Sequence, residues 1–478
     1  MRDSTTSYTS PQSNTKRTRE SIRDALDIHV LGVCSGSGLI QLDCALVRYR
    51  QASPRAALRL ELVQYGSVPT SSIVRNQILA SLREVECNPT VVAHVNTLLG
   101  CMFSNGIKTF CHNYGVQIDS IDMIGTHMSG LRRVAMPESD DLNMHTLGWN
   151  VDVTANTGVT TVFDFAVIET SYVKPHVSPV AFVNRIFLRH PFKFRACLPI
   201  GELVNCSFIP PWTDGSPWKT YWRDCGPGSL LVNYAVRYCT SNNCHEDNNG
   251  KLGMRGMVNQ AVVKQFLAYN DYSTSLPSPR IAREMFGDHE AQRLIDTCLS
   301  LKLSRADIIA TITRITAENM LRQYCRLLAL GFSEHQTVEE LFISGPSARN
   351  TNIIDYLEAE LPESVITKPL DDIGIPGDAN EAVCYAHLAL EAVLGVPIRS
   401  SVALSWPPIQ VGEDVVLGRV VQGMGWGNLS SRLQNFGNGK PRCIARHVKI
   451  SGNMELGFQN LGLTSRGGMR GANVMELS

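Results

Sequence analysis

A short turn of small residues, CSGSG at positions 34–38, is the first stretch of this chain that could do chemistry. It follows an apolar run at 28–33 and precedes a second at 41–49, so it joins two expected strands. Small residues at such a turn let backbone N–H groups close around a phosphate. A plain hairpin would use the same residues, so the turn alone predicts either a phosphate site or a simple connection.

Four other side chains have types suited to catalysis or ligand binding, and each has a plain structural alternative. Two apolar runs that read as strands end in His127 and Glu169. A glutamate there can act as a general base or merely contact solvent, and the histidine can contact a ligand or be held by its neighbours. Trp149 has an aromatic face that can stack on a ligand or fill space. Glu381 opens a helix, where a carboxylate also favours the helix dipole.

The elements that must position these residues form two similar series. Strand-like runs lie at 28–33, 41–49, 58–65, 121–127 and 160–169, with a strand, glycine turn and strand within 194–211 and a strand, small-residue loop and helix within 338–361. Helical spacing occurs at 71–86, 90–114, 230–239, 257–268, 288–301, 304–331 and 378–394. Each series starts with a glycine-turn hairpin and continues with alternating helices and strands. This repetition predicts a duplicated α/β architecture, for which an actin-like, ribonuclease-H-like fold is one of several doubly wound candidates.

Composition narrows the class of protein. The chain has 478 residues, 44% of them hydrophobic and 18% charged, with 44 basic and 44 acidic side chains. This balance gives no global attraction to nucleic acid or to an anionic membrane, and no apolar run approaches the ~18 residues of a membrane span. The 14 cysteines are scattered without metal-binding spacing, which favours buried thiols in a reducing cytoplasm.

The same sequence patterns predict the domain organisation. We expect a disordered leader over 1–27, a first lobe over 28–190 and a second lobe over 191–400. The remaining residues, 401–478, lose periodicity and end in a glycine-rich tail, so a divergent and partly disordered segment is expected there.

The order of motifs resembles that of the anhydro-N-acetylmuramic acid kinases, and among them a divergent fungal type. The family's opening signature is M-S-G-T-S-x-D-G-x-D. At the first turn of this chain, Gly36 and Asp43 are kept, and Ser37 retains the hydroxyl of the family's threonine. Ile40 and Gln41 stand where the family has Asp-Gly.

The resemblance extends over roughly residues 28–425, because further blocks occur in family order. These are GTHMSG at 125–130, TGVTTVFDFAVIE at 157–169, PIGELVN at 199–205, DCGPGSLLVN at 224–233, SPRIARE at 278–284, ATITRITAEN at 310–319, ISGPSARNTN at 343–352 and GIPGDANEAVCYA at 374–386. Several family glycines are replaced, among them by Val173, Lys174 and Glu202.

This resemblance implies a two-lobed actin-like ATPase fold and an ATP- and Mg²⁺-dependent sugar kinase. Members hydrolyse the 1,6-anhydro bond of a muramic sugar while transferring the γ-phosphoryl of ATP to O6. It implies a small-molecule sugar substrate, no nucleic-acid or membrane partner, a homodimer and a cytoplasmic location.

Roles for individual residues follow from the same resemblance. Glu169 takes the place of the general base. The expected nucleotide-binding residues are Gly36, Ser37, Gly38, Asp43, Gly201, Asp224, Gly226, Pro227, Gly228, Gly345 and Asn350. The expected sugar-binding residues are His127, Trp149 and Glu381, and Asp43 and Asp224 are the expected magnesium ligands.

The departures from the family pattern bear on catalysis. Ile40 removes an acidic contact near the phosphates, and a side chain in place of glycine obstructs backbone that must approach a phosphate closely. We therefore expect impaired or altered catalysis. The alternative is a pseudokinase that keeps the fold and acts by binding a ligand or a partner.

Overall fold

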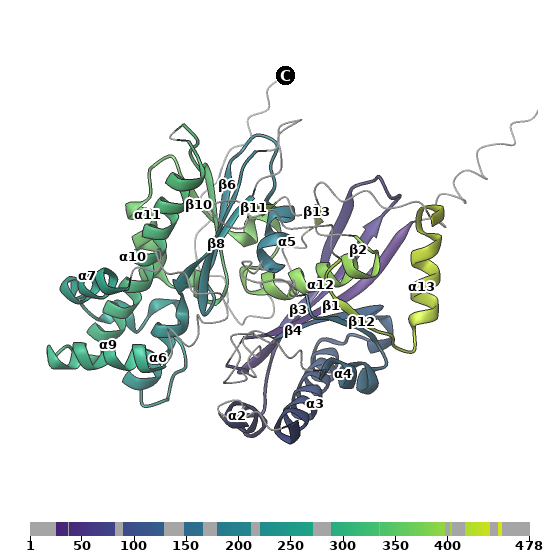
Figure 1. The fold of residues 1–478 in the computed structure, drawn as a ribbon, viewed down its shortest axis with the longest axis horizontal. Coiled ribbons are helices and arrows are strands. Elements are labelled where there is room, and N and C mark those ends of the chain that lie inside the picture. Colours follow the sequence, from purple (N-terminus) through teal and green to yellow (C-terminus); the bar gives the residue numbers. More distant parts are fainter. Residues whose placement is uncertain are drawn as a thin grey trace, which may run out of the picture.

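The computed structural model describes residues 25–36, 38–81, 89–128, 148–165, 179–211, 220–270, 288–333, 335–396, 402–403, 416–439 and 448–451. Figure 1 shows these residues as two lobes, each built on a twisted sheet, with helices between the sheets. Among these residues, no helix is both long and apolar enough to cross a membrane.

The first sheet has seven strands in the order β12-β5-β4-β1-β2-β3-β13. Its centre is an antiparallel meander extended by two strands parallel to β1. The strands are β1 (Leu26–Ser35), β2 (Gln41–Gln51), β3 (Leu58–Pro69), β4 (Met123–Met128), β5 (Thr160–Phe163), β12 (Arg419–Val421) and β13 (Val448–Ser451). β1 is buried along almost its whole length because apolar clusters pack on both faces of the sheet.

Helices of the first lobe cover one face of this sheet. They are α2 (Ser72–Ser81), α3 (Pro89–Tyr114), the short η1 (Ile118–Ser120) and α4 (Asn150–Thr157). The apolar positions of α3 recur at helical spacing, so Leu99, Phe103 and Ile107 are buried together against Leu31 and Val33 of β1.

The second sheet repeats the first. Its six strands run in the order β10-β9-β6-β7-β8-β11, again an antiparallel meander with two strands added parallel to the first of the three. The strands are β6 (Arg195–Pro199), β7 (Leu203–Ile209), β8 (Thr220–Pro227), β9 (Glu340–Ser344), β10 (Ile366–Pro369) and β11 (Val402–Ala403). This duplicated strand order confirms the predicted two-lobed, actin-like α/β fold.

Helices of the second lobe lie mostly on its outer side, away from the first lobe (Figure 1). They are α6 (Ser229–Cys239), η2 (Asn248–Gly250), η3 (Gly253–Arg255), α7 (Gln260–Tyr269), α9 (Asp288–Ser300), α10 (Arg305–Gly331), η4 (Pro346–Arg349), α11 (Thr351–Glu360), η5 (Leu370–Ile373) and η6 (Gly377–Ala379). The longest, α10, begins at a capping box in which Ser304 and Asp307 bond to each other's backbone N–H.

Two helices cross between the lobes and join their cores. α5 (Pro179–Leu188) follows the first sheet but contacts β7, and α12 (Asn380–Val393) follows the second sheet but packs on β1 and β4. A side chain at Gly32 of β1 or Gly125 of β4 would overlap the backbone of α12. These glycines therefore allow the helix to lie directly on the first sheet.

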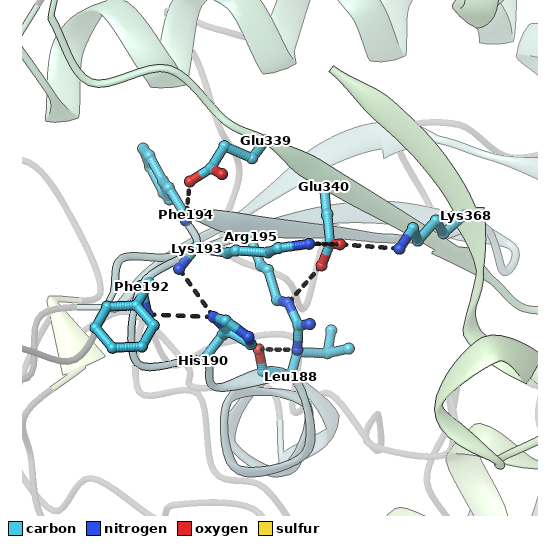
Figure 2. A network of polar contacts seen from close by, with 9 residues as sticks. All are labelled: Leu188, His190, Phe192, Lys193, Phe194, Arg195, Glu339, Glu340 and Lys368. Atoms are coloured by element: carbon cyan, nitrogen blue, oxygen red, sulfur yellow. Dashed lines mark hydrogen bonds and ion pairs between the residues drawn. The ribbon is translucent and has the colours of Figure 1, made fainter. Parts of the chain in front are cut away.

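A charged network ties together the strand beginnings of the second sheet (Figure 2). The side chain of Glu340 is 1% exposed and accepts from Lys193 Nζ at 2.5 Å, Arg195 Nε at 2.8 Å and Lys368 Nζ at 2.8 Å. Burial acts to raise the pKa of Glu340, but the bonds from both lysines and the charge of Arg195 outweigh it and lower that pKa to about 2.

The described residues after position 415 return to the first sheet. β12 (Arg419–Val421) pairs antiparallel with β5 at one edge, and β13 (Val448–Ser451) pairs parallel with β3 at the other. Between them lie α13 (Trp426–Asn435) and η7 (Phe436–Gly439). The sequence did not predict these elements.

Candidate functional site

Several of the predicted site residues that the structure describes lie where the two sheets end, at a place we call the junction. The junction comprises the β1–β2 turn, the β6–β7 turn, the loop that leaves β9 and the η5–η6 segment. The η5–η6 segment contacts both lobes, because η6 packs against β2 and against β9. The N–H of Gly345, just after β9, donates to the carbonyl of Gly377 at 3.2 Å.

Asp43 lies at the start of β2 with its carboxylate held in place. Oδ1 accepts from Gln41 Nε2 at 2.9 Å and from Ser67 Oγ at 2.6 Å. Burial raises the pKa of Asp43, the two hydrogen bonds lower it, and the charges of Asp378 and Glu246 raise it, so that the net shift is upward. A carboxylate among other acids is stabilised by a nearby cation, so this electrostatic setting fits a magnesium ion.

The other predicted magnesium ligand, Asp224, lies on β8, where its backbone pairs with Asn205 of β7; the placement of its side chain is not described. Among the described residues, no three histidine, cysteine or acidic side chains come together to hold a metal. Magnesium held by few protein ligands commonly keeps several waters.

The β1–β2 turn has open space in front of Gly36. A side chain at Gly36 would meet no atom within 4 Å, whereas one at Gly38 would touch Ile40. The turn is closed by bonds from Leu39 N to the Gly36 carbonyl and from Thr70 N to the Ile40 carbonyl, each 3.0 Å. Ile40 is 45% exposed. The described backbone thus leaves room for a phosphate at Gly36; Ser37 lies outside the described residues.

The glycines of the second lobe divide into two kinds. A side chain at Gly201 would make only an ordinary contact with the Leu203 carbonyl, at 3.5 Å. In contrast, a side chain at Gly228 would overlap the Gly201 carbonyl, and one at Gly345, whose φ is +90°, would lie 2.7 Å from the Ile200 carbonyl. Gly228 and Gly345 are therefore required by the close approach of three chain segments, whether or not a nucleotide binds.

Gly226 and Pro227 end β8 beside the same turn. Gly226 has a φ of +106° at a β-bulge opposite Val204, a conformation that favours glycine. The N–H groups of Gly228 and Ser229 donate to the carbonyls of Glu202 and Gly201, each at 2.8 Å. The β6–β7 turn therefore occupies these two donors at the beginning of α6.

Asn350 has a structural role in the described contacts. Its side chain is buried and its Oδ1 accepts from Asn352 N at 3.1 Å, which caps α11. Asn352 in turn donates to the Gly250 carbonyl at 2.8 Å, so this cap also fixes the loop around η2. A nucleotide contact by Asn350 stays a prediction.

The predicted sugar-binding residues lie around the β4 end and α12. The His127 ring stacks on Tyr385 with 4.3 Å between ring centres. Glu381 is half-buried in the first turn of α12, and its charge adds to burial in raising the pKa of Cys34 at the end of β1. These residues come from both sides of the junction, which the fold brings together.

Of the two remaining predicted site residues, the structure describes Trp149 but not Glu169. Trp149 is 5% exposed and packs on Phe103 at 4.2 Å between ring centres, so the space-filling alternative describes its contacts. Its neighbour Asn150 accepts a 2.5 Å bond from Thr126 Oγ1 at the end of β4. The predicted base, Glu169, lies outside the described residues.

Sequence reasoning missed three contributors to the junction: Gln41, Ser67 and Asp378. Gln41 lies two positions before Asp43 and so shares its face of the strand, a signal that the sequence did contain. Ser67 faces Asp43 only because β2 and β3 pair in this register, and Asp378 approaches only because η6 crosses to the first lobe. Neither the Ser67 bond nor the approach of Asp378 could be inferred without the fold.

Together these features define a two-lobed α/β protein of the actin-like class, with a polar site where its sheets end. The chain belongs to the anhydro-N-acetylmuramic acid kinase family, whose model matches residues 28–403. The anhydro-N-acetylmuramic acid kinase of Caldanaerobacter subterraneus subsp. tengcongensis is 26% identical over 371 residues, which cover 77% of this chain and 91% of that protein. The enzyme of the same name from Trichormus variabilis is 26% identical over 408 residues, covering 84% and 98%.

A solved structure with a similar outline is component A of Acidaminococcus fermentans (R)-2-hydroxyglutaryl-CoA dehydratase. It is 13% identical, with a TM-score of 0.37, and the match covers 75% of this chain and 96% of that one.

Proposed function

We propose that the chain is an ATP-dependent sugar kinase that opens a 1,6-anhydro amino sugar and phosphorylates its O6. Membership of the family supports the reaction class. Relatives named anhydro-N-acetylmuramic acid kinase match this chain over most of its length. The observation that carries the proposal is the placement of Asp43, held beside the open turn at Gly36 and facing the acidic residues of the opposite lobe.

The reaction balances as a hydrolysis coupled to a phosphoryl transfer. Water attacks C1 of the sugar and gives its proton to Glu169, the C1–O6 bond breaks, and O6 forms a bond to the γ-phosphorus as the bond to ADP breaks. The water oxygen becomes the C1 hydroxyl. The products are ADP and a sugar 6-phosphate.

The described residues supply binding and charge for this reaction. Backbone at Gly36 would contact a phosphate, and Asp43 would hold magnesium through its waters. Magnesium bound there would offset the charge of the transferring phosphate. His127 and Glu381 would contact the sugar from β4 and α12.

Two measurements test this proposal. Magnesium-ATP at millimolar concentration should raise the melting temperature, and ADP should form only when 1,6-anhydro-N-acetylmuramic acid is present. Glu169→Gln should abolish turnover while ATP still stabilises the protein. Failure of ATP to stabilise the protein would contradict the kinase, and turnover by Glu169→Gln equal to that of the natural chain would remove the base assignment.

A pseudokinase is the second candidate, favoured by the exposed Ile40 at the phosphate turn. It predicts ATP binding without turnover. If Ile40→Asp with Glu169→Asp then restored turnover, the natural chain would be a decayed kinase.

The family likeness also supports a homodimer in the cytoplasm, and light scattering of the purified chain tests the dimer.

A further inference from the structure

The segment over residues 416–439, which we call the arm, packs closely on the exit of β5. Residues 419–421 of the arm pair with β5, placing Arg419 opposite Phe163. Just before them, Gly418 has a φ of +108°, and a side chain there would lie 3.2 Å from the ring of Phe165. The backbone of the arm therefore lies so close to Phe165 that position 418 favours glycine.

The residue between β5 and Phe165 has an unusual conformation. Asp164 has a φ of +60°, in the left-handed region that non-glycine residues rarely adopt. Its side chain is 8% exposed and bonds at 3.0 Å to Nε of Arg419. A left-handed aspartate persists only where its surroundings hold it, and the arm supplies part of that hold.

Phe165 connects this turn to the site through two ring contacts. Its ring stacks on Tyr385 of α12 with centres 5.7 Å apart, and Tyr385 stacks on His127 at 4.3 Å. Phe165 is completely buried and Tyr385 nearly so. Because a close-packed interior transmits small displacements, a shift of the β5 exit would move the His127 ring.

We propose that Arg419 is a positioning residue: by holding Asp164 in its left-handed turn, it seats Phe165 against Tyr385 and so fixes the imidazole of His127. The kinetic part of this inference rests on the proposed function, in which His127 contacts the sugar. The structural part does not require that function.

The arm offers a matched control at the opposite end of the sheet. Arg432 of α13 pairs with Asp122, the residue just before β4, far along the strand from His127. Both arginines join the arm to an aspartate of the first lobe, but only Arg419 acts at the strand ends that face the junction. Loss of either ion pair should weaken the attachment of the arm, whereas only loss of the Arg419 pair should change the position of the His127 imidazole.

The first test follows the imidazole of His127 by NMR in protein with isotope-labelled histidines, its signal assigned with His127→Gln. Arg419→Met should shift this signal, Arg419→Lys should largely restore it, and Arg432→Met should leave it unchanged. Asp164→Ala, which removes the partner of Arg419 and disfavours the left-handed turn, should give a shift in the same direction as Arg419→Met. An unchanged signal in Arg419→Met, or equal shifts in Arg419→Met and Arg432→Met, would overturn the proposal.

The second test is kinetic. Arg419→Met should raise the KM for the anhydro sugar by on the order of 10-fold, because a displacement of the His127 ring well below 1 Å weakens its contact with the sugar. The KM for ATP should stay constant, because His127 does not contact the nucleotide. Equal changes in both KM values would contradict the positioning role. If the natural chain does not turn over the sugar, the proposed function fails, and the NMR shift still decides whether Arg419 positions His127.

Discussion

Gln41 donates a hydrogen bond of 2.9 Å from Nε2 to Oδ1 of Asp43. Gln41 stands where the family pattern has a glycine, so this replacement gives the carboxylate a donor that a glycine cannot provide. The bond favours the charged form of Asp43 against the burial and the acidic neighbours that raise its pKa. The departure at Gln41 is therefore compatible with a working site.

The first prediction concerns the pKa of Asp43. Gln41→Leu removes a hydrogen bond that lowers the pKa of the Asp43 carboxyl, so that pKa should rise further above its usual range. Because the charged form binds magnesium, the acidic limb of the pH profile for magnesium-ATP affinity should move to higher pH. Gln64→Leu is the matched control, because Gln64 donates to the Tyr65 carbonyl and not to Asp43. Identical profiles for the natural chain and Gln41→Leu would contradict the role given to this bond.

The second prediction concerns the carboxylate itself. Asp43→Asn keeps the size of the side chain and removes its charge, so turnover should fall on the order of 100-fold while the fold is retained. Asp27→Asn is the control, because Asp27 pairs with Arg48 at the opposite end of β1. Steady-state kinetics with circular dichroism separates these outcomes, and an equal loss in both variants would remove Asp43 from the site.

The third prediction compares two glycines. At Gly36 a methyl group meets open space, so Gly36→Ala should keep the natural melting temperature and weaken ATP binding about 10-fold or more, equivalent to about 1.4 kcal/mol. At Gly345 the positive φ and the nearby Ile200 carbonyl make Gly345→Ala destabilising by roughly 1–3 kcal/mol without any ligand. Calorimetry measures the melting temperature and the ATP affinity of both variants. Normal ATP affinity in Gly36→Ala would show that the turn does not bind phosphate.

The fourth prediction concerns acid stability. The pKa of Glu340 is about 2 in the folded chain against an ordinary 4.5, so its ionised form stabilises the fold by about 3 kcal/mol. Since the folded pKa is the lower one, this contribution is full above pH 4.5 and is lost as the pH falls towards 2. Glu340→Gln should unfold more readily at neutral pH and lose less stability on acidification.

Denaturant titrations across this pH range test the fourth prediction. Glu339→Gln is the control, because Glu339 lies next in sequence and accepts only from the Phe194 backbone among the contacts described for it. Parallel pH profiles for the natural chain and Glu340→Gln would contradict the assignment.

Much of the fold could be predicted from sequence because the hydrophobic spacing is clear in its long elements. The helix predicted at 304–331 forms at Arg305–Gly331, and the strands predicted at 28–33 and 41–49 form β1 and β2. β8 was missed because its residues, TYWRDCGP, lack an apolar alternation; it is a strand because Trp222 and its neighbours pair with β7. The helix α13 was missed because only Leu429 is buried along it.

The site was predictable only in part. Asp43 and the glycines of the turns could be named from motif order, and the structure places the described ones at the junction or in its supporting turns. The identity of their partners could not be inferred, since Ser67 and Asp378 reach Asp43 through strand register and interlobe packing. The Trp149 ring packs among apolar side chains, and its contact with a sugar stays a prediction.

The most direct test of the central claim is a single-turnover reaction with magnesium-ATP and 1,6-anhydro-N-acetylmuramic acid in water enriched in heavy oxygen. Mass spectrometry of the products reports both the phosphate and the origin of the C1 hydroxyl. The account predicts one ADP for each sugar 6-phosphate, with one heavy oxygen at C1. Absence of a sugar phosphate with enzyme in excess, or a sugar phosphate that lacks the label, would contradict it.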